Sequence, residues 1–94
     1  MQTFSYDHLV AWIDHLHDLY DGRSIEEIAR IENVTVNTSN LHDKGYQTIR
    51  LGSELVITLN THHTRHQRWH WFMGALAAER VREGVNAYDR MLVS

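Results

Sequence analysis

The chain has 94 residues, of which 43% are hydrophobic and 10% aromatic, a composition typical of a folded globular protein and not of a disordered tail. It contains no cysteine, which excludes disulfide bonds and thiolate metal sites, and its formal net charge of −3 argues against broad phosphate binding by the whole domain. We expect one domain over residues 1–94. Because the chain shows neither a signal segment nor a long apolar run, we also expect a cytoplasmic protein that does not cross a membrane.

The first third of the chain carries two helix patterns. Apolar residues recur at three- and four-residue steps from Leu9 to Tyr20, which predicts an amphipathic helix over residues 5–20. Ser24 and Glu27 have the spacing of a capping box, which predicts a short second helix from Ile25 to Glu32. We interpret the histidines of the first helix as solvent-facing residues without a role: His8, His15 and His17.

The middle of the chain is rich in alternating, β-branched residues. Residues 34–38 predict one strand, and residues 46–51 and 54–60 predict two more, joined by Gly52-Ser53 as a two-residue hairpin loop. After residue 60 the apolar period becomes helical again. The sequence therefore predicts an α+β fold with N-terminal helices, a small three-stranded and mostly antiparallel sheet, and a C-terminal helix that bears histidines.

Four of the eight histidines lie between His62 and His70. On a helix His66 and His70 are four residues apart and share one face, which is the spacing by which a helix offers two nitrogens to one zinc ion. The zinc-hydrolase pattern H-E-x-x-H appears here with Gln67 in place of the glutamate that acts as general base. A glutamine can hold a water molecule but cannot accept its proton. These residues predict a zinc site that is structural and not catalytic.

The remaining zinc ligands are open from the sequence, because zinc takes about four. Glu79 has suitable chemistry, but a continuous helix would carry it far from the histidine pair. A turn before the helix could instead bring back His62 or His63, and of these we select His63. The alternative is that the histidines are a polar beginning of the helix and bind no metal.

Several short segments resemble those of the ImmA/IrrE metallopeptidase family. Members of that family typically show I-E-E-I-A and V-x-V before the sheet, I-x-L-N before the H-E-x-x-H helix, and a final E-x-A-N-x-F-A-x-x-L-L helix. The matching segments here are Ile25-Glu26-Glu27-Ile28-Ala29, Val34-Thr35-Val36, Val56-Ile57-Thr58-Leu59-Asn60 and Glu83-Gly84-Val85-Asn86-Ala87-Tyr88-Asp89-Arg90-Met91-Leu92. Gly84 interrupts the helical pattern and so predicts a shorter final helix at residues 85–92. The resemblance maps the family's glutamate ligand loosely onto Glu83.

The chain departs from the family pattern at the metal motif itself. The segment between Asn60 and His66 is shorter than in the family, and an alignment that keeps the longer segment would place the motif at Met73-Gly74-Ala75-Leu76-Ala77, with no ligand left. Both alignments predict that the protein is not an enzyme. They differ on whether zinc is bound.

The resemblance, together with the lost base, implies a non-catalytic regulator or inhibitor that acts by binding another protein. Small proteins of this kind are carried by phages and mobile elements, and their typical targets are host proteins such as a repressor system or a CRISPR effector nuclease. Trp69 and Trp71 project from different sides of the helix, so both cannot enter one small core. We therefore expect Trp71 in an exposed patch, with Arg65 and Arg68, as the partner-binding residues.

Two other functions fit parts of the sequence. The segment from Ser24 to Ala29 resembles the first helix of a winged helix-turn-helix DNA-binding domain, but its recognition helix would have to be residues 34–40, which are β-branched and contain no arginine or lysine. We therefore expect no nucleic-acid partner. An active zinc hydrolase is the least favoured, since no nearby carboxylate on the same helix face replaces Gln67.

Overall fold

A computed structural model describes residues 6–84 of the chain, and in this part the predicted α+β class is confirmed. The elements, in chain order, are α1 (Tyr6–Tyr20), α2 (Ile25–Glu32), β1 (Thr35–Ser39), β2 (Tyr46–Leu51), β3 (Glu54–Asn60) and α3 (Arg65–Arg82). The predicted start of the first helix at residue 5 and the predicted final helix at residues 85–92 lie outside the described residues.

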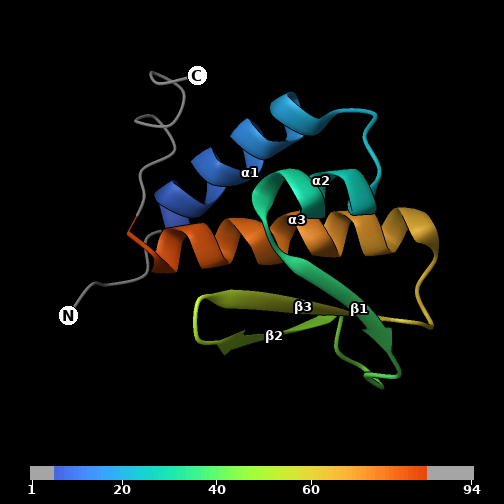
Figure 1. The fold of residues 1–94 in the computed structure, drawn as a ribbon. Helices are drawn as coiled ribbons and strands as arrows, with labels where there is room; N and C mark the ends of the chain where they lie inside the picture. The colour runs from blue at the N-terminus through green and yellow to red at the C-terminus, as the bar shows by residue number, and fades with distance from the viewer. Residues whose placement is uncertain (1–5, 85–94) are drawn as a thin grey trace.

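Helix α3 is the central element of the fold. Figure 1 shows α3 between α1 and the sheet, and contacts on both sides confirm that it packs against α1, β2 and β3. Helices α1 and α3 run in opposite directions, so the end of α1 lies beside the beginning of α3. This arrangement places the histidine-rich segment next to a helix that precedes it by about fifty residues in the chain.

The sheet is mixed, with strand order β1-β3-β2. The hairpin of β2 and β3 is antiparallel as predicted, with Leu51 opposite Glu54. Strand β1 pairs with β3 in parallel, with Thr35 opposite Val56, so the sheet is less antiparallel than the sequence suggested. The physical reason is burial: β3 has five buried residues of seven and takes the centre, while the more polar β1 and β2 form the edges.

The core lies between one face of the sheet and the inner sides of α1 and α3. Trp12 and Leu16 of α1 meet Phe72 and Leu76 of α3, and all four are fully buried. The sheet contributes the inward side chains of β3, which are Leu55, Ile57 and Leu59. Successive side chains of β3 point to opposite faces of the sheet, so these three residues cover the face that packs on the core.

Two of the predictions can be tested directly against these elements. A winged helix-turn-helix would need a helix over residues 34–40, and β1 occupies Thr35–Ser39 as a strand, so the DNA-binding alternative loses its recognition helix. Within residues 6–84, no helix is both long and apolar enough to cross a membrane.

Candidate functional site

The beginning of α3 is fixed by a capping box. The Thr64 hydroxyl oxygen accepts a hydrogen bond from the backbone N–H of Gln67 at 3.2 Å, and the Gln67 side-chain oxygen accepts one from the Thr64 N–H at 2.8 Å. Two of the helix's otherwise unpaired N–H groups are thus satisfied, which starts the helix at Arg65. The same bond turns the Gln67 side chain back toward Thr64.

His66 and His70 form a close pair on the exposed first two turns of α3. Their Nε2 atoms lie 3.1 Å apart and the ring centroids 4.5 Å apart, with the rings nearly perpendicular. Two nitrogens bound to one tetrahedral zinc ion at the usual bond lengths lie about 3.3 Å from each other. The observed separation is that of a hydrogen bond between the two rings, and it is about 0.2 Å shorter than the spacing of two ligands of one metal ion.

The protonation of His70 favours this role. Partial burial lowers the pKa of His70 below its ordinary value, and positive charge on His66 and on His17 lowers it further. The imidazole is consequently held in its neutral form, which is the form that binds a metal ion.

His17 of α1 belongs to the same cluster, which the sequence did not predict. Its ring is half-buried, 5.8 Å from the His70 ring and edge-on to the Trp69 ring at 5.2 Å, measured between centroids. The Trp69 indole N–H donates to the carbonyl of Arg23 at 2.9 Å and so ties the beginning of α3 to the loop after α1. No local signal marks His17, because only the packing of α1 on α3 brings it to the pair.

His15 also differs from the solvent-facing position expected for it. It is 7% exposed, and its ring meets the ring of Trp12 edge-on at 5.7 Å. One side of α1 thus buries aromatic rings in the core, and His15 is part of that packing.

His63, selected as a third metal ligand, lies against Trp71. The two ring centroids are 6.1 Å apart, and the His63 Nδ1 atom is buried without a hydrogen-bond partner within residues 6–84. With the side chains as they stand, the described residues contain no group of three or more histidines or carboxylates placed to hold one metal ion. The third ligand at His63 stays a prediction.

The two glutamates considered as ligands are engaged at the other end of α3. Glu79 is 5% exposed and accepts a hydrogen bond from the Thr48 hydroxyl at 3.0 Å. Glu83 pairs with Arg50 at 2.8 Å and with Arg80 at 2.8 Å. Burial alone would raise the pKa of Glu83, but the hydrogen bonds and positive charges of these two arginines outweigh it and lower that pKa. Both carboxylates therefore serve ion pairs between α3 and β2.

The alternative alignment places the metal motif in the interior. Met73 and Ala77 are fully buried in the middle of α3, and neither side chain can ligate zinc through nitrogen or oxygen. Among the described residues, the exposed pair His66 and His70 is thus the part of α3 that offers metal ligands.

The predicted partner-binding residues differ in their solvent exposure and in their contacts with the rest of the chain. Trp71 is 42% exposed, as expected, and packs partly on Tyr46 at a centroid distance of 5.9 Å and over Gly45, where an added Cβ would overlap the indole. Arg65 is exposed. Arg68 is half-buried and donates to the His63 carbonyl at 2.7 Å, so it is held within the chain.

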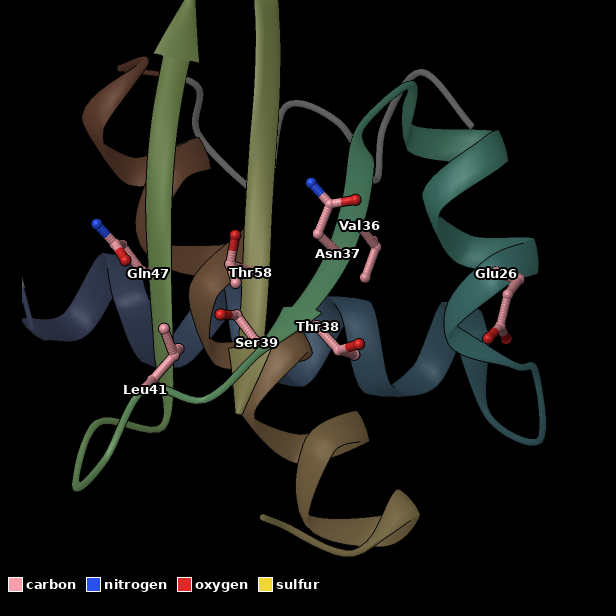
Figure 2. Close-up of a pocket in the computed structure, with 8 residues that line it drawn as sticks. All are labelled: Glu26, Val36, Asn37, Thr38, Ser39, Leu41, Gln47 and Thr58. Atoms are coloured by element: carbon pink, nitrogen blue, oxygen red, sulfur yellow. The ribbon is translucent and has the colours of Figure 1, made fainter. Parts of the chain in front are cut away.

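Several hollows lie at the surface of residues 6–84, among them two of about 720 and 730 Å³. One, of about 730 Å³, runs beside His66 between the start of α3 and the loop after α1, and its lining includes Asp21, Arg65 and Trp69. The other, of about 720 Å³, is shown in Figure 2; its lining comes from all three strands, from the loop after β1 and from Glu26 of α2. Hydroxyl and amide groups dominate this second lining, which contains no histidine. The first hollow is the one that adjoins the histidine cluster.

The chain matches no known protein family, no curated protein and no solved structure. The geometry at the beginning of α3 therefore carries the functional assignment.

Proposed function

We propose that this protein is a non-catalytic regulator that binds another protein and holds a zinc ion in a structural role through His66 and His70. The main support for the metal site is the 3.1 Å separation of the two Nε2 atoms, which lie on exposed turns of a capped helix. Imidazole nitrogens suit zinc, and a tetrahedral ion would leave two positions for water or further side chains. When bound, the ion would contribute stability to a small domain and no chemistry.

The absence of catalysis in this proposal rests on Gln67. A general base must accept a proton from the metal-bound water, and an amide cannot do so. The Gln67 amide oxygen is in addition committed to the Thr64 N–H as part of the capping box. The resemblance to the ImmA/IrrE family fits a fold from which the catalytic group was lost.

The partner in this proposal is a protein, and the contact surface centres on Trp71 with Arg65. A tryptophan that is 42% exposed and an exposed arginine on the same helix are residue types that are enriched in interface anchors. The resemblance to small regulators of phages and mobile elements makes a host protein the expected partner, and the protein would act there as an inhibitor.

The metal site is tested with protein purified without a metal-affinity tag. We expect elemental analysis to find about one zinc per chain. We also expect a chelator to lower the melting temperature, because an ion that binds only the folded state stabilises that state. The stabilisation is about 2.7 kcal/mol when the free ion is at a hundredfold excess over its dissociation constant. His66→Ala and His70→Ala should each remove the response to chelator. His62→Ala, in the same segment but outside the pair, is the matched control and should retain it. The site would be contradicted if the tag-free protein contained no zinc and if its melting temperature did not change with chelator or with added zinc.

The partner surface is tested by comparing variants in affinity capture from host extract. A specific partner should be retained by the wild type and by Leu19→Ala, which changes an exposed apolar residue elsewhere. It should be lost with Arg65→Glu and with Trp71→Ala, whose folding is checked by circular dichroism. Equal capture by all four proteins would contradict this surface.

A further inference from the structure

His17 of α1 lies against His70 of the histidine pair. Its ring centroid is 5.8 Å from that of His70, while His66 and His70 are 4.5 Å apart on the same measure. Two imidazoles that share one tetrahedral zinc ion have ring centres about 5 Å apart, because each centre is about 3.2 Å from the ion. The two observed separations lie on either side of that value.

For the three histidines to share one ion, the His17 ring would have to turn about its own side-chain bonds. As the rings stand, no three potential ligands among the described residues surround one position. Within residues 6–84, however, the His17 ring makes an edge-on contact with Trp69 and a tilted contact with His70, and no hydrogen bond or ion pair fixes it. Rotation toward the pair therefore breaks no polar interaction, and a side chain turns in this way on a fast timescale.

Charged side chains of both signs line the hollow beside His66, and a hydrogen bond holds its frame. Asp21, in the loop after α1 and four residues after His17, lines this hollow together with Glu26, Glu27 and three arginines. Arg68, one of those arginines, donates to the His63 carbonyl. The Trp69 bond to the Arg23 carbonyl fixes the distance between the end of α1 and the beginning of α3.

We infer that His17 of α1 completes a three-histidine site with His66 and His70 for a divalent ion of the zinc, copper and nickel class. Imidazole is a good ligand for these ions, and three nitrogens leave the fourth position of a tetrahedral ion to water or to a partner side chain. The ion would link two helices that are far apart in the sequence and would act as a staple between α1 and α3. This inference rests on the proposed metal site and adds its third ligand, taking the place predicted for His63.

The inference is tested by titrating the full tag-free chain with Zn²⁺ and recording both affinity and the ring signals of each histidine. His17→Ala should weaken Zn²⁺ binding by at least about tenfold, since even a group that only supports a ligand costs a site that much. His63→Ala and His62→Ala should bind like the wild type. In the wild type, the ¹⁵N signals of the His17 ring should move to metal-bound positions together with those of His66 and His70.

The outcomes separate this inference from the site on which it rests. Wild-type and His17→Ala proteins that bind Zn²⁺ equally, with unmoved His17 ring signals, would overturn the third ligand and leave the pair intact. A loss of affinity in His63→Ala and not in His17→Ala would return the ligand to His63. A wild-type chain that binds no Zn²⁺ would overturn both.

Discussion

Single residues at the beginning of α3 have roles that their types alone do not reveal. Gln67 occupies the position of a catalytic base in the H-E-x-x-H pattern, yet its side chain closes the capping box of the helix. His70, four residues from His66, has its pKa lowered by partial burial and by two neighbouring histidines. Both observations predict how a single substitution changes the stability of the protein.

Gln67→Glu should stabilise the protein and should not create a peptidase. A carboxylate keeps the acceptor for the Thr64 N–H and adds negative charge to the first helical turn, which is worth about 0.3–1 kcal/mol. Urea denaturation measures the gain, with Gln67→Ala as the control that loses the capping bond. Hydrolysis of a fluorogenic peptide by Gln67→Glu in the presence of zinc would show instead that a catalytic geometry survives.

The stability of the metal-free protein should fall on acidification, partly through His70. In the unfolded chain this histidine takes a proton near its ordinary pKa of 6.5, whereas in the folded chain its pKa is lower. Between these two values the unfolded state binds more protons, so the contribution of His70 is complete above about pH 6.5 and is lost as the pH falls through the folded pKa. Melting temperatures from pH 7.5 to 5 should therefore drop less for His70→Gln than for the wild type.

The control for this pH dependence is His62→Gln, which changes an exposed histidine of the same segment. It should follow the wild-type profile. Parallel profiles for His70→Gln and the wild type would show that the neighbouring histidines do not perturb His70.

At the scale of an element, the transition from β3 to α3 depends on Asn60. This fully buried side chain donates to the carbonyls of His42 and Lys44, each at 2.9 Å, and accepts from the His62 N–H at 3.0 Å. It thus joins three segments: the end of β3, the loop before β2, and the turn that carries the histidines. The position of the metal ligands depends on a residue that is not itself a ligand.

Asn60→Ala should lower the free energy of unfolding by about 2–4 kcal/mol, because it leaves two carbonyls and one N–H without partners in a buried place. The effect is measured by chemical denaturation. Asn40→Ala is the comparison, since its side chain accepts one exposed bond from the His42 N–H at 3.0 Å, and its cost should stay below about 1 kcal/mol. Similar small losses in both variants would mean that water replaces the Asn60 bonds.

Across the whole molecule, an ion pair and a hydrogen bond to one buried carboxylate join the three helices. Arg80 of α3 bonds the buried carboxylate of Glu32 of α2 at 3.1 Å, and Glu32 also accepts a bond from the hydroxyl of Tyr20 of α1. The Glu32 side chain is 2% exposed and that of Arg80 is 15% exposed. Three helices therefore meet at one desolvated charge.

Arg80→Ala should destabilise the fold by about 3–5 kcal/mol, because it removes the ion pair of the buried Glu32 carboxylate. Adding Glu32→Gln should recover part of this loss, since the amide keeps an acceptor for Tyr20 and removes the buried charge. Thermal melts of the two single variants and the double variant form a double-mutant cycle. Additive losses would show that the two side chains contribute independently.

Local sequence determined most of the secondary structure of this protein. The capping box of Ser24 and Glu27 sets the start of α2, and Gly52-Ser53 sets the register of the β2–β3 hairpin. Both are short-range effects: a side chain bonds a backbone group three residues away, and a loop of fixed length aligns its two flanking strands. The spacing of His66 and His70 likewise needs only the geometry of one helix.

The order of the strands and the membership of the histidine cluster depend on how the elements pack together. Strand β3 takes the centre of the sheet because it is the most buried strand, and β1 becomes its parallel neighbour as a consequence. His17 joins His70, and His63 joins Trp71, because helices packed on a shared core bring together residues that are distant in the chain. Periodicity shows which face of a helix is buried, but not which element covers it; that depends on how all the apolar faces are buried together.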